Sequence, residues 1–413
     1  MGAQDLLDSF YSIDNLVSIE IEIDSAKWND LVLKASPREL GAPNSDGPQK
    51  RYDWVETTSV TISGTKFPKK STFTQVAIIK KSFYGSLSFT KPSFKLDFTR
   101  LNKANEDEIK SLIGTDRLVL NNCKQDPGYV RQPLGNELLR QADLPSFRCN
   151  FATVRVNGQF WGGKDEITRN GKVKTTFLPA DGVYVNIEAF KKKFIQNQFK
   201  SDKGNAYEID FSMDFDPDRV AEGYMSFEGF SEHKDRKDLL RAAREIKDHG
   251  LAGAKKVIAW DQYIRFFAME ALLQHWDGYN HSMNNAFIYN DQKAKADPDI
   301  EKNEIKFSFI PTGLDQILQY DQEILFSGWK SVLANLTIAD KEANAQLNDE
   351  VRKLAEKIFG AKNLADSIYP YLDKETDVLR SAKASFKQDD VDAMKKRLSN
   401  MQSWAYAKVG APK

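Results

Sequence analysis

The chain has 413 residues, of which 41% are hydrophobic and 11% aromatic, enough to bury the cores of two lobes and to exclude wholesale disorder. Its 59 Lys and Arg residues balance 59 Asp and Glu residues, so no long-range field would gather nucleic acid or an anionic membrane. Two cysteines make no disulfide framework, and no apolar run is long enough to predict a membrane span.

The first third of the chain predicts a β-rich unit. Residues 16–23 alternate apolar and charged side chains, as in a half-buried strand. Residues 36–50 contain three prolines and two glycines and predict a long surface loop. Val, Ile, Thr and Phe are then frequent, and they predict strands at 55–62, 74–80, 86–90 and 93–98.

The next segment mixes a helix with further strands. Helical spacing covers Tyr129 to Gln141, with Asp126 as the expected N-cap and Pro127 at the first helical position. A strand at 149–156 leads to the hairpin signal Asn157-Gly158 and a return strand from Gln159 to Trp161. A polar, Lys-rich insertion at 163–182 precedes an extended segment at 183–188 and a helix that begins near Ala189.

The second half of the chain is predominantly helical. Helices are predicted at 234–248, 254–259 and 261–275, and the last is apolar on nearly all sides, which indicates burial. Two strands, 286–289 and 305–310, flank a charged loop at 290–304. From Trp329 onward the pattern is helical, with a last helix near 389–407. We therefore predict an α+β protein with a β-rich lobe at 1–200 and a helical lobe at 201–413.

The strongest functional signal follows the buried helix. His275-Trp276-Asp277-Gly278-Tyr279 is followed by Asn284-Asn285, and Asp315 follows the second strand. A catalytic Asp, an Asn and a second Asp are the polar groups with which protein kinases orient a hydroxyl and hold metal on ATP. The ordinary kinase motif is absent, because Asn285 comes eight residues after Asp277 instead of five. A turn-capping Asp and an Asn at a strand entry are the structural alternatives.

Six segments together resemble the CotH family of spore-coat kinase-like proteins. They are Lys91 to Lys95, Asp126 to Arg131, Val156 to Gly162, Val183 to Glu188, His275 to Asn285 and Pro311 to Asp315. The resemblance implies an atypical, two-lobed protein-kinase-like fold that uses ATP with Mg²⁺ or Mn²⁺. It also implies transfer of the γ-phosphate to Ser or Thr of a secreted, cell-surface or spore-coat protein.

The resemblance assigns roles to residues in the second half. Asp277 corresponds to the catalytic base, while Asn285 (or Asn284) and Asp315 correspond to metal ligands. This chain departs from the family's Pro-Trp-Asp-x-Asp run, because Gly313 stands where the first of its two carboxylates is expected. That loss would weaken metal binding or mark a protein that binds nucleotide without turning it over.

Phosphate-binding candidates lie in the first half. Lys91 and Lys95, four apart in an extended segment, are expected on one side, and either can pair with Glu188. Ser86 and Ser88 lie in a turn that resembles the family's phosphate-covering Arg-Gly-x-Ser-Ser, although Tyr84 replaces the Arg. Arg131 can add positive charge near the nucleotide. The structural alternatives are solvated strand lysines and a surface arginine.

Two other functions remain open. A non-catalytic coat-assembly protein or surface adhesin would retain the same fold, and the departures at Gly313 and Tyr84 favour it. A glycoside hydrolase with Asp277 and Asp315 as paired carboxylates has no supporting family pattern.

Overall fold

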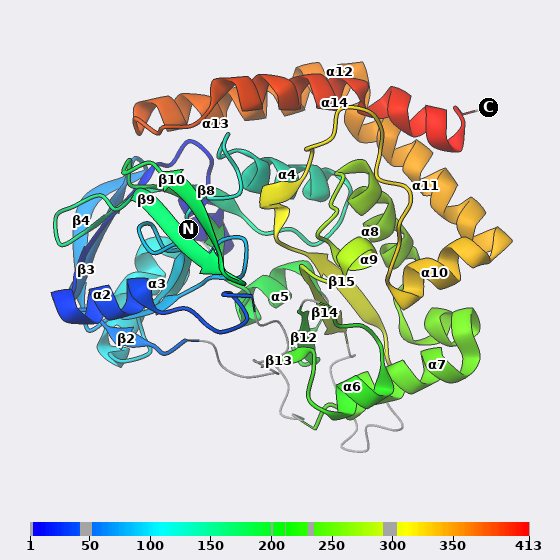
Figure 1. Cartoon of the computed structure of the whole chain (residues 1–413), viewed down its shortest axis with the longest axis horizontal. Coiled ribbons are helices and arrows are strands. Elements are labelled where there is room, and N and C mark those ends of the chain that lie inside the picture. The colour runs from blue at the N-terminus through cyan, green and yellow to red at the C-terminus, as the bar shows by residue number, and fades with distance from the viewer. Residues whose placement is uncertain are drawn as a thin grey trace. The chain divides into compact units, whose positions relative to one another are not determined.

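The computed structural model describes residues 3–41, 52–199, 201–210, 212–229, 235–291 and 304–412 (Figure 1). They form two compact units with interleaved boundaries. Unit 1 contains 1–133, 147–189 and 371–390, and unit 2 contains 134–146, 190–370 and 391–413. The predicted α+β class, with a large sheet and a helical C-terminal part, is confirmed. The lobe boundary placed after residue 200 stays a prediction.

Unit 1 is built on a nine-stranded sheet with the order β2-β5-β6-β7-β11-β8-β1-β3-β4. All neighbours are antiparallel except β1 and β8, which are parallel. The strands are β1 Val17–Glu22, β2 Val55–Glu56, β3 Ser59–Gly64, β4 Phe67–Thr74, β5 Ala77–Lys80, β6 Phe94–Asp97, β7 Arg117–Asn121, β8 Cys149–Val156 and β11 Val183–Glu188.

One face of this sheet forms the core of unit 1. The alternating side chains of β6 place Phe94 and Leu96 on that face, where both are fully buried. They share a hydrophobic cluster with residues of α1 Ala3–Phe10, α2 Ser25–Leu33 and α3 Glu106–Ile113. Burial of each large side chain contributes about 1.5–3 kcal/mol, so the cluster fixes the register of the strands.

Three predictions in unit 1 are wrong at the level of local structure. Residues 86–90 form a turn and not a strand, because the Ser86 and Ser88 hydroxyls bind nearby main-chain groups. The helix α4 Arg131–Gln141 begins four residues after Pro127, and the Asp126 carboxylate accepts the Arg131 N–H at 2.7 Å. The return strand after Asn157-Gly158 is reduced to a single bridge between Val156 and Gln159.

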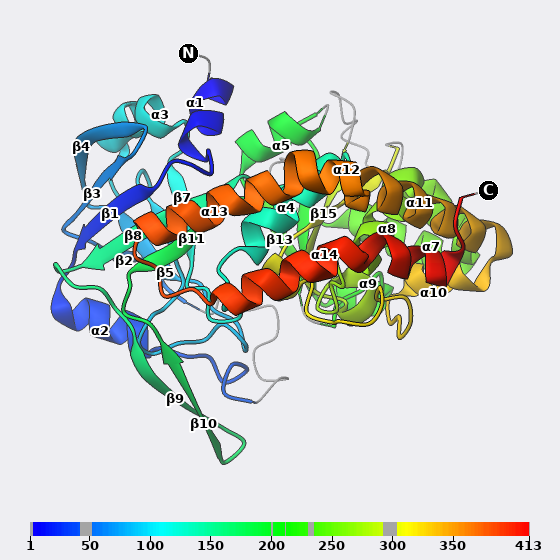
Figure 2. The ribbon, with the colours of Figure 1, turned by 90° about the horizontal axis from the view of Figure 1, so that it is seen from above.

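The predicted insertion is a two-stranded ribbon. Strands β9 Gly163–Arg169 and β10 Lys172–Leu178 pair with each other, and the ribbon extends away from the large sheet of its unit (Figure 2). Asn170 and Gly171 join the strands with left-handed φ angles of 48° and 74°, as a tight hairpin turn requires. The register places Asp165 and Ile167 on a buried face and Val173 and Phe177 on an exposed one.

Unit 2 contains a four-stranded antiparallel sheet, β13-β12-β14-β15. Its strands are β12 Ala206–Ile209, β13 Ser226–Gly229, β14 Ala286–Asn290 and β15 Phe307–Pro311. The last two confirm the predicted strands, although most of the predicted loop between them lies outside the described residues. Strands β12 and β13, each of four residues, were not predicted.

The helices of unit 2 confirm the predicted helical second half. The two helices predicted at 234–248 and 254–259 form one, α7 Lys237–Val257, with a kink at Gly250; residue 234 is not described. Helix α8 Trp260–Leu272 is buried almost throughout, as predicted, and packs against α11 Lys341–Phe359. The others are α5 Lys192–Gln198, α6 Pro217–Ala221, α9 Tyr279–Ser282, α10 Val332–Ala339 and α12 Ala361–Asn363.

Two long helices end the chain, α13 Tyr369–Ser381 and α14 Gln388–Val409. Helix α14 confirms the one predicted near 389–407, and it buries Met394, Leu398 and Met401 at helical spacing. Across the part of the chain that the structure describes, every helix is too short or too polar to cross a bilayer.

Candidate functional site

A buried carboxylate shapes the loop after α8. Glu270 accepts hydrogen bonds from the N–H groups of Tyr279 and Asn280, at 2.8 and 3.0 Å, and from Asn280 Nδ2 at 2.7 Å. Burial raises the pKa of Glu270 to about 8. A Cβ at Gly278 would lie 2.2 Å from Glu270 Oε1, so only glycine permits this approach. The sequence analysis missed Glu270, whose one signal is an acidic residue in the apolar second half of the helix.

The same loop presents Asp277 to two carboxamides. Asn284 Nδ2 donates to Asp277 Oδ1 at 3.2 Å, and Asn285 Nδ2 donates to Asp277 Oδ2 at 2.9 Å. Met283 and Asn285 both have φ near 50°, a left-handed geometry that returns the chain toward the carboxylate. The structure therefore brings together three residues that the sequence analysis selected.

The charge state of Asp277 is set by its surroundings. The pKa of Asp277 is raised to about 6: partial burial and, more weakly, the charge of Asp315 raise it, and hydrogen bonds from Asn284 and Asn285 oppose the rise. Asp277 is thus ionised at neutral pH and remains more basic than an exposed aspartate. A carboxylate with this balance is suited to accept a proton.

Gly313 makes a close approach that no other residue allows. It has φ of 64°, and a Cβ there would lie 2.3 Å from both Cγ and Oδ1 of Asn285. Its carbonyl lies 3.2 Å from His275 Nε2, and Thr312 N–H donates to the Asn285 carbonyl at 3.0 Å. The departure from the family run is therefore matched to the position of Asn285, whose side chain fills the space beside Gly313.

These oxygen-bearing side chains fit a divalent metal held together with phosphates. Asp315 supplies a carboxylate, and Asn285 or Asn284 a carboxamide oxygen, which are hard ligands of the kind Mg²⁺ and Mn²⁺ accept. The repulsion between Asp277 and Asp315 is a further feature that a cation would relieve. No group of three or more His, Cys, Asp or Glu side chains that could hold a metal ion occurs in the described ranges, so phosphate oxygens would complete the coordination.

The two candidate lysines of unit 1 have different surroundings. Lys91 is fully buried, and its Nζ lies 2.7 Å from Asp181 Oδ1, between the rings of Tyr129 and Tyr184. Lys95 is half-buried on β6 and points away from the core face that Phe94 and Leu96 form. Among the described residues Lys95 makes no ion pair, so it is the more available cation.

Neither lysine pairs with Glu188. The Glu188 carboxylate instead binds the Arg148 guanidinium at 2.9 and 3.0 Å. Asp181, the actual partner of Lys91, also accepts the Ser385 N–H at 2.9 Å. The sequence analysis missed Asp181, because it lies 90 residues after Lys91 in the sequence and the two meet only in the folded structure.

Arg131 is committed to a buried ion-pair network. Its Nη1 lies 2.7 Å from Asp126 Oδ1, and its Nη2 lies 2.8 Å from Asp390 Oδ1 at the start of α14. The carboxylate of Glu375, buried nearby with neither oxygen hydrogen-bonded, has a raised pKa because of desolvation and the charge of Asp126. Arg131 therefore joins the start of α4 to α14 within unit 1.

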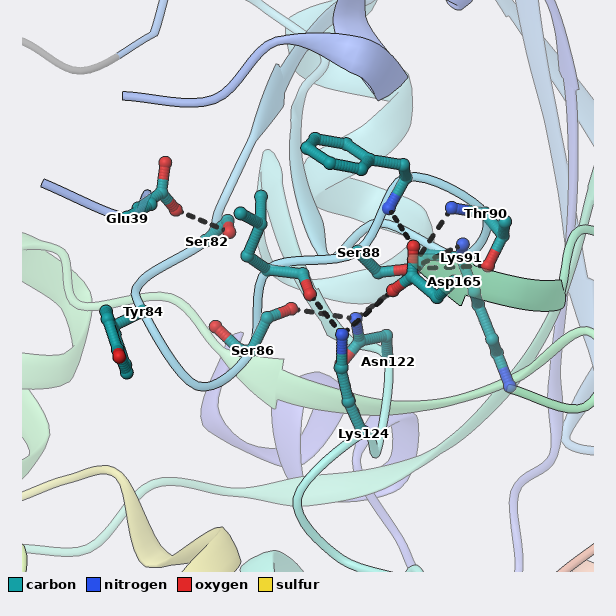
Figure 3. A network of polar contacts seen from close by, with 12 residues as sticks. Glu39, Ser82, Tyr84, Ser86, Ser88, Thr90, Lys91, Asn122, Lys124 and Asp165 are labelled. Atoms are coloured by element: carbon teal, nitrogen blue, oxygen red, sulfur yellow. Dashed lines mark hydrogen bonds and ion pairs between the residues drawn. The ribbon is translucent and has the colours of Figure 1, made fainter. Parts of the chain in front are cut away.

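The hydroxyls of Ser86 and Ser88 are used inside their own turn (Figure 3). Ser86 Oγ accepts the Phe83 N–H at 3.0 Å. Ser88 Oγ accepts the N–H groups of Thr90 and Lys91, at 3.1 and 2.9 Å. Both hydroxyl oxygens therefore act as acceptors that shape this segment of the chain.

A protein-family model described as CotH kinase protein matches residues 82–410. The chain belongs to the CotH kinase family. The match contains every site residue described above and leaves residues 1–81 and 411–413 outside it. No curated protein matched the chain. Membership makes this a kinase-like protein, and its α+β architecture agrees with the two-lobed kinase-like fold that the sequence predicts.

Restoring the family's carboxylate should damage the CotH site. In Gly313→Asp the new Cβ meets Asn285 and the left-handed backbone becomes strained, so we expect lower stability and weaker Mn²⁺ binding than in the wild type. Gly313→Ala, with the same Cβ and no charge, is the matched control and should lose similar stability. Calorimetric Mn²⁺ titration and thermal unfolding measure both. Tighter Mn²⁺ binding by Gly313→Asp would contradict this account.

The raised pKa of Asp277 predicts a pH-dependent stability. A carboxyl with a raised folded-state pKa stabilises the fold fully below its unfolded pKa of about 4, and this stabilisation is lost as pH rises through about 6. From pH 4 to 8, without metal, we expect Asp277→Asn to gain on the order of 1–2 kcal/mol in unfolding free energy relative to the wild type. Urea unfolding at both pH values measures this, and a constant difference would refute it.

Removal of the Arg131 side chain should lower the stability of the fold. Arg131→Ala leaves Asp126 buried without its cation, which costs roughly 3–5 kcal/mol of unfolding free energy. Chemical denaturation measures this loss. Arg140→Ala, at an exposed position of α4, is the control and should change stability by less than about 1 kcal/mol. Wild-type stability in Arg131→Ala would show that the network is unimportant for the fold.

Proposed function

We propose that this protein is an atypical Ser/Thr protein kinase that uses ATP with Mg²⁺ or Mn²⁺. The observation that carries the proposal is the placement of Asp277 between the Asn284 and Asn285 carboxamides, with Asp315 close enough to raise its pKa. A base, a metal carboxylate and a neutral oxygen ligand are the set that phosphoryl transfer from ATP requires.

In this proposal Asp277 accepts the proton of the acceptor hydroxyl as that oxygen forms its bond to the γ-phosphorus. The bond from the γ-phosphorus to the β–γ bridging oxygen breaks, and ADP leaves with the electron pair. Hydrogen bonds from Asn284 and Asn285 keep both carboxylate oxygens oriented, and Glu270 holds the loop that carries them. The divalent cation, when bound by Asp315 and Asn285, would offset the negative charge of the phosphates.

Of the two candidate lysines, we propose Lys95 for phosphate binding, because the Lys91 ammonium already forms a buried ion pair with Asp181. The acceptor we propose is a Ser or Thr of a coat, surface or secreted protein, which is what the CotH kinase family suggests. The protein would then act in the spore coat, at the cell surface or outside the cell.

A non-catalytic assembly protein is the second candidate. Tyr84, which replaces the family's Arg in the phosphate-covering turn, favours it. Gly313 gives the non-catalytic candidate little support, since the Asn285 side chain fills the space beside its Cα.

Transfer of radiolabelled γ-phosphate to the protein itself or to Ser-rich peptides tests the proposal. Asp277→Asn should lower the rate roughly 10²–10⁴-fold, because a positioned base is lost. Asp315→Ala should abolish metal-dependent nucleotide binding as well as transfer. Asp366→Asn, an exposed aspartate of unit 2, is the matched control and should retain wild-type rates.

Phosphate transfer and stabilisation by nucleotide distinguish the kinase from the non-catalytic assembly protein. Wild-type protein that shows neither transfer nor stabilisation by ATP with Mg²⁺ or Mn²⁺ would support the non-catalytic function. Transfer that survives Asp277→Asn at the wild-type rate would remove Asp277 from the role of base.

A further inference from the structure

Strand β10 gives the two-stranded ribbon of unit 1 a free edge (Figure 2). Within the described ranges β10 pairs with β9 alone, and the register between the two strands runs without a bulge. The edge of a sheet presents unpaired N–H and C=O groups, which can receive a further strand. The ribbon can therefore bind an extended segment of another chain through its main chain.

The hairpin turn determines which groups of β10 lie on that edge. Both residues of the turn have left-handed φ angles, and the register flanks them with Arg169 and Lys172. A two-residue turn of this kind closes on a hydrogen-bonded pair, and hydrogen-bonded and non-hydrogen-bonded pairs alternate along the ladder. The N–H and C=O groups of Val173, Thr175 and Phe177 therefore point away from β9.

One face of β10 presents apolar side chains beside this edge. Phe177 is 72% exposed and Val173 is 63% exposed, and both lie on the same face because they are four residues apart in a strand. Their cross-strand neighbours on β9, Lys164 and Thr168, leave them uncovered. This face therefore offers apolar surface to a segment that pairs with β10.

The opposite face of β10 is basic near the hairpin turn. Lys172 and Lys174 are exposed and, among the described residues, make no ion pair. The ribbon at 163–178 contains four Lys and Arg residues and two Asp and Glu residues, a net charge of +2. A second copy of the ribbon would bring the same excess of positive charge. The charge of this surface therefore favours an acidic partner segment.

The edge strand β4 of the large sheet differs from β10. It contains the exposed Pro68, and its pairing with β3 has a register shift. A proline and a bulge at an edge both oppose pairing with another chain. Strand β10 has neither of these features, and it exposes Phe177. Of these two edges of unit 1, β10 is the one that can accept a further strand.

We propose that the β10 edge binds an extended segment of a partner protein in which acidic residues alternate with Val, Ile or Phe. The segment adds a third strand to the ribbon, and its main chain pairs with Val173, Thr175 and Phe177. Its apolar side chains pack on Val173 and Phe177, and its acidic side chains reach Lys172 and Lys174. The inference does not depend on the proposed kinase activity.

A fluorescent synthetic peptide that alternates Glu with Val and Phe tests the proposal on the full chain, with binding followed by anisotropy. Phe177→Ser should weaken binding about tenfold, because the apolar contact is lost. Lys172→Glu combined with Lys174→Glu should also weaken it about tenfold and remove most of its salt dependence. A peptide of the same composition with its Glu residues grouped at one end should bind about tenfold more weakly than the alternating one.

Two matched controls lie outside the ribbon. Leu33→Ser removes an apolar side chain of α2 that is 65% exposed, and Lys69→Glu reverses an exposed charge on β4. Both variants should bind the alternating peptide as the wild type does. Weakening by these controls equal to that by the ribbon variants would show non-specific binding and overturn the proposal.

Two readouts separate strand addition from contact by side chains alone. Peptide binding should slow hydrogen exchange at the amides of Val173, Thr175 and Phe177, which become hydrogen-bonded. Successive amides of a strand point to opposite edges, so N-methylation at every second residue blocks one edge of the peptide. Of the two peptides methylated in alternate phases, one should lose binding and the other should keep it. Equal behaviour of the two would overturn strand addition.

Other occupants of the edge give different results. Binding to phosphatidylserine vesicles that Phe177→Ser abolishes, without peptide binding, would assign the edge to a membrane surface and overturn the proposal. A concentration-dependent dimer that Phe177→Ser dissociates, again without peptide binding, would assign it to a second copy and also overturn the proposal. Wild-type affinity for the peptide in Phe177→Ser would place the peptide elsewhere on the protein.

Discussion

The electrostatic repulsion between the Asp277 and Asp315 carboxylates is the constraint on which the site depends. The charge of Asp315 raises the pKa of the partly buried Asp277, so the two carboxylates repel each other, while hydrogen bonds from Asn284 and Asn285 hold the Asp277 side chain in place. The arrangement is costly without a cation and favourable with one. That difference is what links the geometry of the loop to metal-dependent chemistry.

Contacts around the site keep the loop in place despite this electrostatic repulsion. The buried Glu270 carboxylate takes three hydrogen bonds from the loop, and Gly278 and Gly313 are needed because a Cβ at either would strike the groups that form the site. In unit 1 the same principle applies to Lys124 and Asp165, whose ion pair fixes a turn by binding its main chain. Both units therefore use buried acidic side chains to set backbone geometry.

The sequence predicted what periodicity and local chemistry determine. Helix α8, with apolar residues on all sides, and the group of Asp277 with Asn285 belong to this class, since few residues separate the partners. It failed where individual side-chain hydrogen bonds, near or far along the chain, decide the local structure. Residues 86–90 have the composition of a strand, but their serine hydroxyls accept hydrogen bonds from the main chain and form a turn. Lys91 pairs with Asp181 instead of Glu188. The sequence around Glu270 does not show that its carboxyl group accepts hydrogen bonds from the following loop.

The most direct measurement is a crystal structure with Mn²⁺ and a non-hydrolysable ATP analogue, in which anomalous scattering locates the metal. We predict a Mn²⁺ peak within bonding distance of an Asp315 oxygen and of a carboxamide oxygen from Asn285 or Asn284, with the γ-phosphate also bound to it. A metal bound elsewhere, or a nucleotide that leaves Asp315 without a metal, would contradict the account.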